Sequence, residues 1–473
     1  MEKLTRKQLP WYALAGFGPN LLNTIITIYL VDALQTTGFG VNVEFWTFAN
    51  KTIVAVALFS VLKFLAQLID GIIDVPFAAL TDNLKTRWGR RRPVMLVGYI
   101  VMMVMYIMFC FPLTVAENSA LNSIYFGILL FVFYSAYTLT FVAYYGTYAE
   151  ITSNEKDRFY LSNWKAFIDT IQYAIAYALI PVFIGMGNNI KYIALFASPL
   201  SLTMIIVFFM LKERSTLPKD VEKYNAAHPE ETEVEKQAEK NIPILQSIKL
   251  TAKNKDFMYW LLILALFFFG LQMFLSGQNV LASGPMGLSG WQIAIINTAA
   301  FAPVPLMLFF YRKIIKKKGF RFAFQTALLS FAVAMLTFSV AYVKWIDSNI
   351  VRLIIGAVGG TIGSYGIGAF FAAPYLVPSQ QAAIEREKTG NNHASMYFAI
   401  QGLATACVGA ISTGLIWPNL RNVVVNGNTL FGAHLMPYIA ALFCVVAFLA
   451  AFKMPASYNT LGKEITPEYK NEK

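Results

Sequence analysis

The chain has 473 residues, of which 57% are hydrophobic and 14% are charged, with a formal net charge of +12. Soluble domains average roughly 45–50% apolar and about 25% charged residues, so this composition argues against a set of soluble domains. The positive charge does not indicate nucleic-acid binding, because the lysines and arginines gather in short loops between apolar runs, as in membrane proteins. Cys110, Cys407 and Cys444 all lie inside apolar runs and indicate neither a disulfide set nor a metal site.

Twelve apolar runs follow one another along the chain, each close to the roughly 20 residues that a helix needs to cross a bilayer. Residues 1–7, ahead of the first run, are polar, so no cleavable signal peptide is expected. The expected spans are 11–34, 51–80, 93–114, 120–149, 163–186, 190–211, 255–282, 290–311, 321–343, 350–377, 394–417 and 431–453.

A polar stretch of mixed charge, 212–253, separates the sixth run from the seventh. Its composition is typical of a solvated linker, and a short amphipathic helix is expected over 242–250. The sequence therefore predicts an all-α membrane protein with twelve transmembrane helices in two pseudo-symmetric six-helix bundles. The expected parts are an N-terminal bundle over 1–211, the linker over 212–253, a C-terminal bundle over 254–455 and a tail over 456–473.

Basic residues are divided unevenly between the loops, which predicts the orientation. The loops after the second and eighth spans are strongly basic, whereas loops 1–2, 3–4, 5–6 and 7–8 carry almost no lysine or arginine. Because basic loops stay in the cytoplasm, both termini and the linker are expected there, with the protein in the plasma membrane. The basic loops fall at the same place in each half, as two repeated halves would produce. Their basic residues are Lys85, Arg87, Arg90, Arg91 and Arg92, and Arg312, Lys313, Lys316, Lys317, Lys318 and Arg321.

Two carboxylates lie inside the second expected span. Asp70 and Asp74 are four residues apart, so they share a helix face about one turn apart. An ionisable group at the centre of a span costs about 2.5–3.5 kcal/mol on insertion scales, so it is kept where it pairs or functions. Adjacent carboxylates at low dielectric share a proton or hold a cation, and oxygen ligands suit hard ions such as sodium. The alternative is that Asp74 only caps or pairs near the cytoplasmic end.

Other charged residues inside or at the ends of spans have two interpretations each. Lys63, about two turns outward from Asp70, either contacts substrate or snorkels toward the outer mouth. Lys165 and Asp169 in the fifth span are again four apart, so they form a local ion pair, or Lys165 faces the aspartates of the second span. Glu150 ends the fourth span and is expected in a cytoplasmic gate.

Aromatic residues are abundant in the fourth span and share one helix face, which most simply indicates packing. Tyrosines that line a cavity nevertheless offer a flat apolar face plus a hydroxyl, a combination that sugars need. Small and polar positions in the first span could line the same cavity. The candidate substrate-binding residues are Asn20, Asn23, Lys63, Tyr137, Phe141, Tyr144, Tyr145 and Trp164.

Three segments resemble one family of transporters. Residues 68–93, LIDGIIDVPFAALTDNLKTRWGRRRP, resemble the second helix and following loop of the glycoside–pentoside–hexuronide:cation symporter family. Residues 384–401, IEREKTGNNHASMYFAIQ, resemble its loop 10–11, and residues 12–30, YALAGFGPNLLNTIITIYL, resemble its first helix. This family, whose best-known member is the melibiose permease, lies within the major facilitator superfamily, so the resemblance implies that superfamily's fold.

The resemblance implies a cation site formed by Asp70 and Asp74, with Thr138 of the fourth helix. A basic residue of the fifth helix matches Lys165, where the melibiose permease has arginine. Ile73 stands where the permease has asparagine, a departure that puts sodium selectivity in doubt and makes proton coupling more plausible. The coupling ion is therefore expected to be H⁺ or Na⁺, with no other cofactor or metal.

The resemblance also implies gating residues and a changed sugar site. Asp82, Arg87 and Arg91 fall where the superfamily's loop 2–3 motif holds the helices in one state. The alternative is that these residues only set the topology. The carboxylates with which the permease grips the sugar are replaced here by Asn20 and Phe141, and its stacking tryptophan is replaced by Tyr145. Galactoside specificity is therefore not expected, and the retained lysines raise the hypothesis of an anionic sugar such as a uronide.

Together these features predict a monomeric, cation-coupled symporter of a sugar or glycoside, working by alternating access and not an enzyme. One alternative is a carrier of lysolipids or other amphipathic solutes within the same superfamily. A remote alternative is a membrane prenyltransferase, since aspartate motifs bind magnesium diphosphate in such enzymes. The chain lacks the second aspartate-rich motif that they need, and its span count exceeds theirs.

Overall fold

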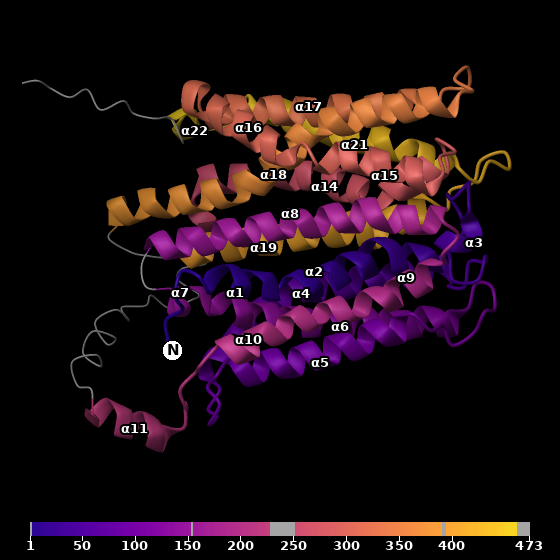
Figure 1. The fold of residues 1–473 in the computed structure, drawn as a ribbon. Coiled ribbons are helices and arrows are strands. Elements are labelled where there is room, and N and C mark those ends of the chain that lie inside the picture. Colours follow the sequence, from indigo (N-terminus) through magenta and orange to yellow (C-terminus); the bar gives the residue numbers. More distant parts are fainter. Residues whose placement is uncertain (1, 153–154, 228–250, 390–393, 461–473) are drawn as a thin grey trace, which may run out of the picture. The chain divides into compact units, whose positions relative to one another are not determined.

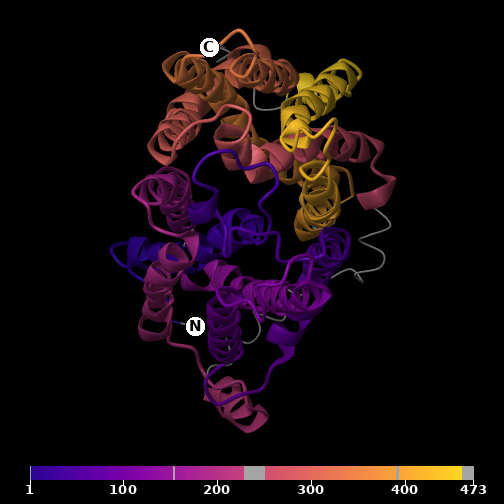
Figure 2. The ribbon, with the colours of Figure 1, turned by 90° about the vertical axis from the view of Figure 1, so that its right-hand side faces the viewer.

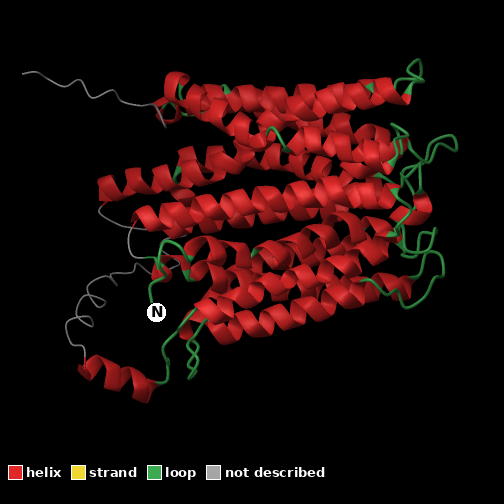
Figure 3. Cartoon of the chain, viewed as in Figure 1, coloured by secondary structure: helices red, strands yellow, loops and turns green. Residues whose placement is uncertain are grey.

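The computed structural model describes residues 2–152, 155–227, 251–389 and 394–460 (Figure 1). Within these ranges the chain forms helices and loops, with one isolated bridge between Val425 and Asn428 (Figure 3). Twelve helical segments of the described chain are long and apolar enough to cross a membrane, which confirms the expected number and the all-α class.

The first six spans lie close to the expected ranges. Short helices α3 (Val43–Trp46), α7 (Tyr148–Ile151) and α11 (Pro218–Ala227) stand between or after them. The spans are formed by α1 (Leu9–Ala15), α2 (Phe17–Thr24), η1 (Ile25–Leu30) and η2 (Asp32–Leu34); α4 (Val56–Asn83); α5 (Arg92–Phe109); α6 (Ala120–Gly146); α8 (Glu155–Gly185); and α9 (Ile190–Ala197), η3 (Ser198–Met204) and α10 (Ile205–Met210).

The last six spans follow the same pattern, with α22 (Ser457–Thr460) after them. They are formed by α14 (Lys255–Ser283); α15 (Gly290–Phe301) and α16 (Val304–Lys318); α17 (Phe320–Val340); α18 (Asn349–Thr389); α19 (Ala394–Gly409), η4 (Ala410–Ile416) and α20 (Trp417–Leu420); and α21 (Phe431–Ala451). The amphipathic helix expected at 242–250 lies outside the described residues.

The chain packs as two compact units, each described by itself. Unit 1 comprises 1–241, 275–294 and 406–433, and unit 2 comprises 242–274, 295–405 and 434–473. Figure 2 views the helices of unit 1 from the end at which α3 lies. These units follow packing and not chain order, so the expected division into bundles over 1–211 and 254–455 stays a prediction.

The first span is built for close packing inside unit 1. A β-carbon added to Gly18 would lie 1.9 Å from the Leu200 carbonyl oxygen, so only glycine permits the observed approach of α2 to η3. Thr203 joins the same contact, since it donates to the Ala15 carbonyl and accepts from the Gly18 amide, each at 3.1 Å. Gly18, one of the small positions of the first span, is therefore a packing residue.

The basic loop expected after the eighth span is mostly helix. Arg312 to Lys318 lie in α16, and the turn to α17 is reduced to Gly319, whose φ of 90° suits glycine. The prediction of a loop here was wrong. Long lysine side chains bury their stems along apolar surface and keep their charges in water, so an apolar helix can continue beyond the bilayer. Lysines in the last helical turn also interact favourably with the helix dipole.

Candidate functional site

Asp70, the first carboxylate of the second span, lies where α4 packs along α6. The Thr138 hydroxyl of α6 donates to Asp70 Oδ1 at 2.6 Å. Asp74, one turn further along α4, interacts electrostatically with Asp70. Thr138 of α6 thus contacts Asp70 of α4, and the assignment of Asp70, Asp74 and Thr138 to a cation site stays a prediction.

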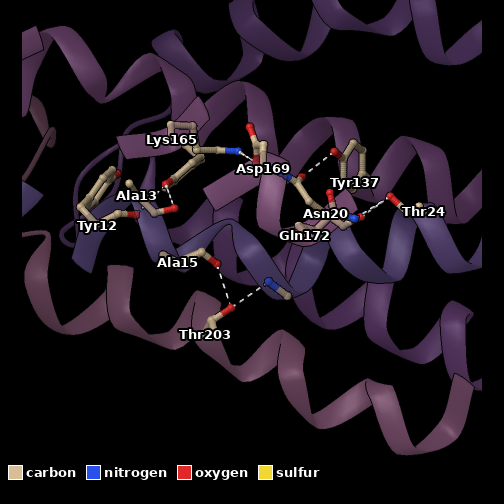
Figure 4. A network of polar contacts seen from close by, with 12 residues as sticks. Tyr12, Ala13, Ala15, Asn20, Thr24, Tyr137, Lys165, Asp169, Gln172 and Thr203 are labelled. Carbon is tan, nitrogen blue, oxygen red and sulfur yellow. Dashed lines mark hydrogen bonds and ion pairs between the residues drawn. The ribbon is translucent and has the colours of Figure 1, made fainter. Parts of the chain in front are cut away.

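A second polar network joins α2, α6 and α8 (Figure 4). The Tyr137 hydroxyl donates to Asn20 Oδ1 at 2.8 Å, and Asn20 Nδ2 donates to Asp169 Oδ1 at 3.0 Å. Lys165 Nζ makes a short ion pair with the same Asp169 oxygen. On the next turn of α8, Gln172 donates to Thr24 at 2.9 Å. Four residues from three different spans are therefore fixed by one chain of hydrogen bonds.

Lys165 takes the local partner that the spacing allowed. Its side chain is 7% exposed and that of Asp169 is 32% exposed. Lys165 Nζ lies 5.8 Å from the centre of the Tyr145 ring, and a β-carbon on Gly16 would meet Lys165 Cε at 3.3 Å. Lys165 of α8 thus lies next to Gly16, between α1 and α2, and next to Tyr145 of α6, while its role at the cation site stays a prediction.

Some aromatic residues of α6 are buried in packing, whereas others are exposed. Tyr144 is fully buried, stacks on Tyr12 and donates to the Tyr12 carbonyl at 2.6 Å, so it joins α6 to α1. Phe141 is buried against Tyr137, with ring centres 4.5 Å apart. Tyr145, by contrast, is 45% exposed. Among these aromatic residues of α6, Tyr137 and Tyr145 place a hydroxyl or a ring face beside the Lys165–Asp169 pair.

Lys63 lies in a different cluster of unit 1, which the sequence analysis missed. Its side chain is buried, and it interacts electrostatically with Asp32 and Arg421. Arg421 Nη1 pairs with Asp32 Oδ1 at 2.8 Å, and Arg421 Nη2 donates to the Thr37 carbonyl at 2.7 Å. An acidic residue at the end of the first span was the available signal, but its partner follows the eleventh span.

The remaining candidate substrate residues have local contacts. Trp164 makes edge contacts with Tyr160 and Phe167 along α8, with ring centres 6.3 and 5.8 Å away. Asn23 accepts from Thr27 at 3.5 Å, one turn along the first span. These contacts neither join Trp164 and Asn23 to the Asp169 network nor test their proposed role.

The loop before α5 is held by an acidic residue that the sequence analysis did not identify. The Glu213 carboxylate accepts from the backbone amides of Arg91 and Arg92 at 3.0 and 3.1 Å, at the start of α5. Arg91 is buried against Gly146, and Arg87 is exposed. The side chains of Asp82 and Glu150 lie outside those that the structure describes.

A sequence profile described as "MFS/sugar transport protein" matches residues 11–455. The chain belongs to this family. Its members are transporters, so the expectation that the chain is not an enzyme is confirmed, and the prenyltransferase alternative is set aside. The chain is a multi-pass membrane protein.

Similar proteins agree with the family. The chain is 25% identical to the lactose permease of Lactobacillus helveticus, over 46% of this chain and 36% of the relative. It is also 25% identical to the isoprimeverose transporter of Lactiplantibacillus pentosus, over 54% of this chain and 51% of the relative. The matches thus span about half, or less, of the relatives' own length.

Solved structures share the fold at low sequence identity. A D-xylose-proton symporter superposes with a TM-score of 0.64 at 14% identity, covering 96% of this chain and 98% of that one. The nucleoside transporter NupG superposes with a TM-score of 0.57 at 13% identity, covering 95% and 98%. These likenesses support the transporter fold of the major facilitator superfamily.

Proposed function

We propose that the protein is a cation-coupled symporter of a sugar or glycoside that works by alternating access in the plasma membrane. The observation that carries the coupling is the hydrogen bond of Thr138 to Asp70, with Asp74 one turn away. Carboxylate and hydroxyl oxygens in a span suit H⁺ or Na⁺ as the coupling ion, with no further cofactor. The transport unit in this proposal is a monomer.

The proposed substrate-binding region is the network of Asn20, Tyr137, Lys165 and Asp169, beside the exposed ring of Tyr145. Such a region offers hydrogen-bond donors and acceptors to hydroxyls and a flat ring to the apolar face of a sugar. The names of the two relatives, a lactose permease and an isoprimeverose transporter, support a sugar as the solute. A uronide is a further hypothesis for the solute.

The test is uptake by the purified protein in liposomes. A panel of disaccharides, pentosides and uronides is offered with an imposed Na⁺ gradient, an imposed pH gradient, or neither. The proposal expects accumulation of at least one sugar under one of the two gradients. Uptake of a lysolipid with no sugar uptake would favour the carrier of amphipathic solutes, and sugar uptake that ignores both gradients would contradict cation coupling.

The proposed orientation predicts opposite labelling of two exposed positions. Glu117 lies in the loop before α6, and Lys219 lies in α11 after the sixth span. The bias of lysine and arginine between loops predicts that Glu117 lies outside and Lys219 lies in the cytoplasm. We expect an impermeant thiol reagent to label Glu117→Cys in intact cells, and Lys219→Cys only after the membrane is opened. Labelling of both from outside would contradict this topology.

The proposed gate predicts a change in accessibility at Gly146. A β-carbon there would lie 3.2 Å from Arg91 Nε, so a thiol at this position reports on the basic loop. If Asp82, Arg87 and Arg91 stabilise the state that is closed to the cytoplasm, Asp82→Ala should destabilise that state. The labelling rate of Gly146→Cys from the cytoplasm should then rise. Topology depends little on acidic residues, so insertion should be unchanged. An unchanged labelling rate with parental transport would leave the loop as a topology signal alone.

A further inference from the structure

Asp169 is the residue at which the polar network of unit 1 converges. It accepts from Lys165 of its own helix and from Asn20 of α2, and Asn20 in turn accepts from Tyr137 of α6 (Figure 4). Both contacts with Asp169 end on the same oxygen, Oδ1. A carboxylate offers about four acceptor positions on its two oxygens, so Asp169 retains acceptor capacity beyond these two bonds.

Asp169 is also the part of the ion pair that a solute can reach. Its side chain is 32% exposed, whereas that of Lys165 is 7% exposed. An exposed carboxylate within a span faces water or protein and not lipid, because a charge in hydrocarbon is strongly disfavoured. Tyr145, 45% exposed, lies over the lysine of the same pair. A partly exposed carboxylate and an exposed aromatic ring therefore both lie next to one buried ammonium group.

The ion pair changes which solutes the region favours. The positive charge of Lys165 is already neutralised by Asp169, so a uronide carboxylate would have to displace Asp169 and would be repelled by it. A neutral sugar requires no such exchange. Its hydroxyls can donate to the free lone pairs of the carboxylate, and its apolar face can lie on an aromatic ring.

We propose that Asp169 accepts a hydrogen bond from a hydroxyl of the sugar and thereby selects neutral sugars over uronides. This inference rests on the proposed function as a sugar transporter and narrows its substrate class. Asp169 is a specificity-determining residue that contacts substrate directly. Lys165 acts through it, by holding the carboxylate in place through the ion pair.

The test compares the binding of matched ligands to the purified full-length protein. A neutral sugar that the parent binds, its deoxy analogues and its uronide are titrated calorimetrically into the parent and into Asp169→Asn. We expect the variant to bind the neutral sugar about 10- to 100-fold more weakly, the range for a hydrogen bond to a charged group. The deoxy analogue that lacks the contacted hydroxyl should bind both proteins equally weakly. The uronide should bind the variant more tightly than the parent, since Lys165 then lacks its partner.

Two further variants separate recognition from folding. Lys165→Met combined with Asp169→Leu removes both charges, so neither is left buried without its partner. This double variant should lose affinity for the neutral sugar without gaining affinity for the uronide. Glu117→Gln, an exposed acidic position in the loop before α6, is the matched control and should bind like the parent.

Three outcomes would overturn the inference. Parental affinity of Asp169→Asn for the neutral sugar would exclude contact with a hydroxyl. A variant that still distinguished the sugar from every deoxy analogue as the parent does would assign Asp169 a positioning role alone. A parent that bound none of the sugars in the panel would overturn the proposed function, and the inference with it. The parent is measured before any variant, so failure of the proposed function can be told apart from failure of the inference about Asp169.

Discussion

Asp70→Asn is expected to abolish accumulation of sugar against its gradient while sugar exchange across the membrane continues. The Asn side-chain carbonyl can still accept the hydrogen bond from the Thr138 hydroxyl, which is 2.6 Å in the parent, so the substitution removes charge with little change in shape. A bound cation and a bound sugar raise each other's affinity by the same factor, typically about 5- to 150-fold. Without the carboxylate charge, this coupling is lost. Asp74→Asn should act in the same direction.

The measurement is the ratio of internal to external sugar in liposomes with an imposed cation gradient, with exchange of labelled sugar measured in parallel. Asp220→Asn changes an exposed carboxylate of α11, outside the spans, and should behave like the parent. Thr138→Val keeps the charge but removes the hydroxyl, so it should weaken the cation dependence less than Asp70→Asn does. If both aspartate variants concentrate sugar like the parent, the cation site lies elsewhere.

Local patterns in the sequence were sufficient to predict the spans and the alternatives for Lys165. Apolar length sets the number of spans, because each must match the bilayer. The spacing of Lys165 and Asp169 allowed an i,i+4 pair, and the structure forms it. What spacing could not supply was the rotation of α8 relative to α2, which brings Asn20 to the same carboxylate. Asp169 therefore received no role in recognition from the sequence.

Contacts between distant segments were beyond prediction from one sequence. Lys63 was interpreted as a substrate contact or as a snorkelling residue, but its neighbours are Asp32 at the end of the first span and Arg421 after the eleventh. Periodicity places a residue on a helix face without naming the helix that it meets. Glu213 was missed for the same reason, since it reaches the start of α5 from the segment after the sixth span.

Asp32→Asn is expected to cause the largest loss of stability among single substitutions in the buried cluster of Asp32, Lys63 and Arg421. Asp32 is 7% exposed, and Arg421 and Lys63 are exposed by 0% and 1%. Removing one partner of a buried pair leaves a charge uncompensated, at a cost of about 3–5 kcal/mol. Asp32 is the acid shared by two basic residues, so its loss leaves two buried positive charges. Arg421→Met should cost less, because Lys63 remains beside Asp32.

The order of these effects is tested by thermal unfolding of the purified protein in detergent. Adding Lys63→Met to Asp32→Asn removes one of the two uncompensated charges, so the double variant should unfold at a higher temperature than Asp32→Asn alone. Arg421 would still be held by its bonds to the Thr37 carbonyl at 2.9 Å from Nε and 2.7 Å from Nη2. Asp347→Asn, in an exposed loop, is the matched control and should unfold like the parent. An Asp32→Asn protein as stable as the parent would show that water or another group compensates the two cations, and the cluster would then contribute little to the fold.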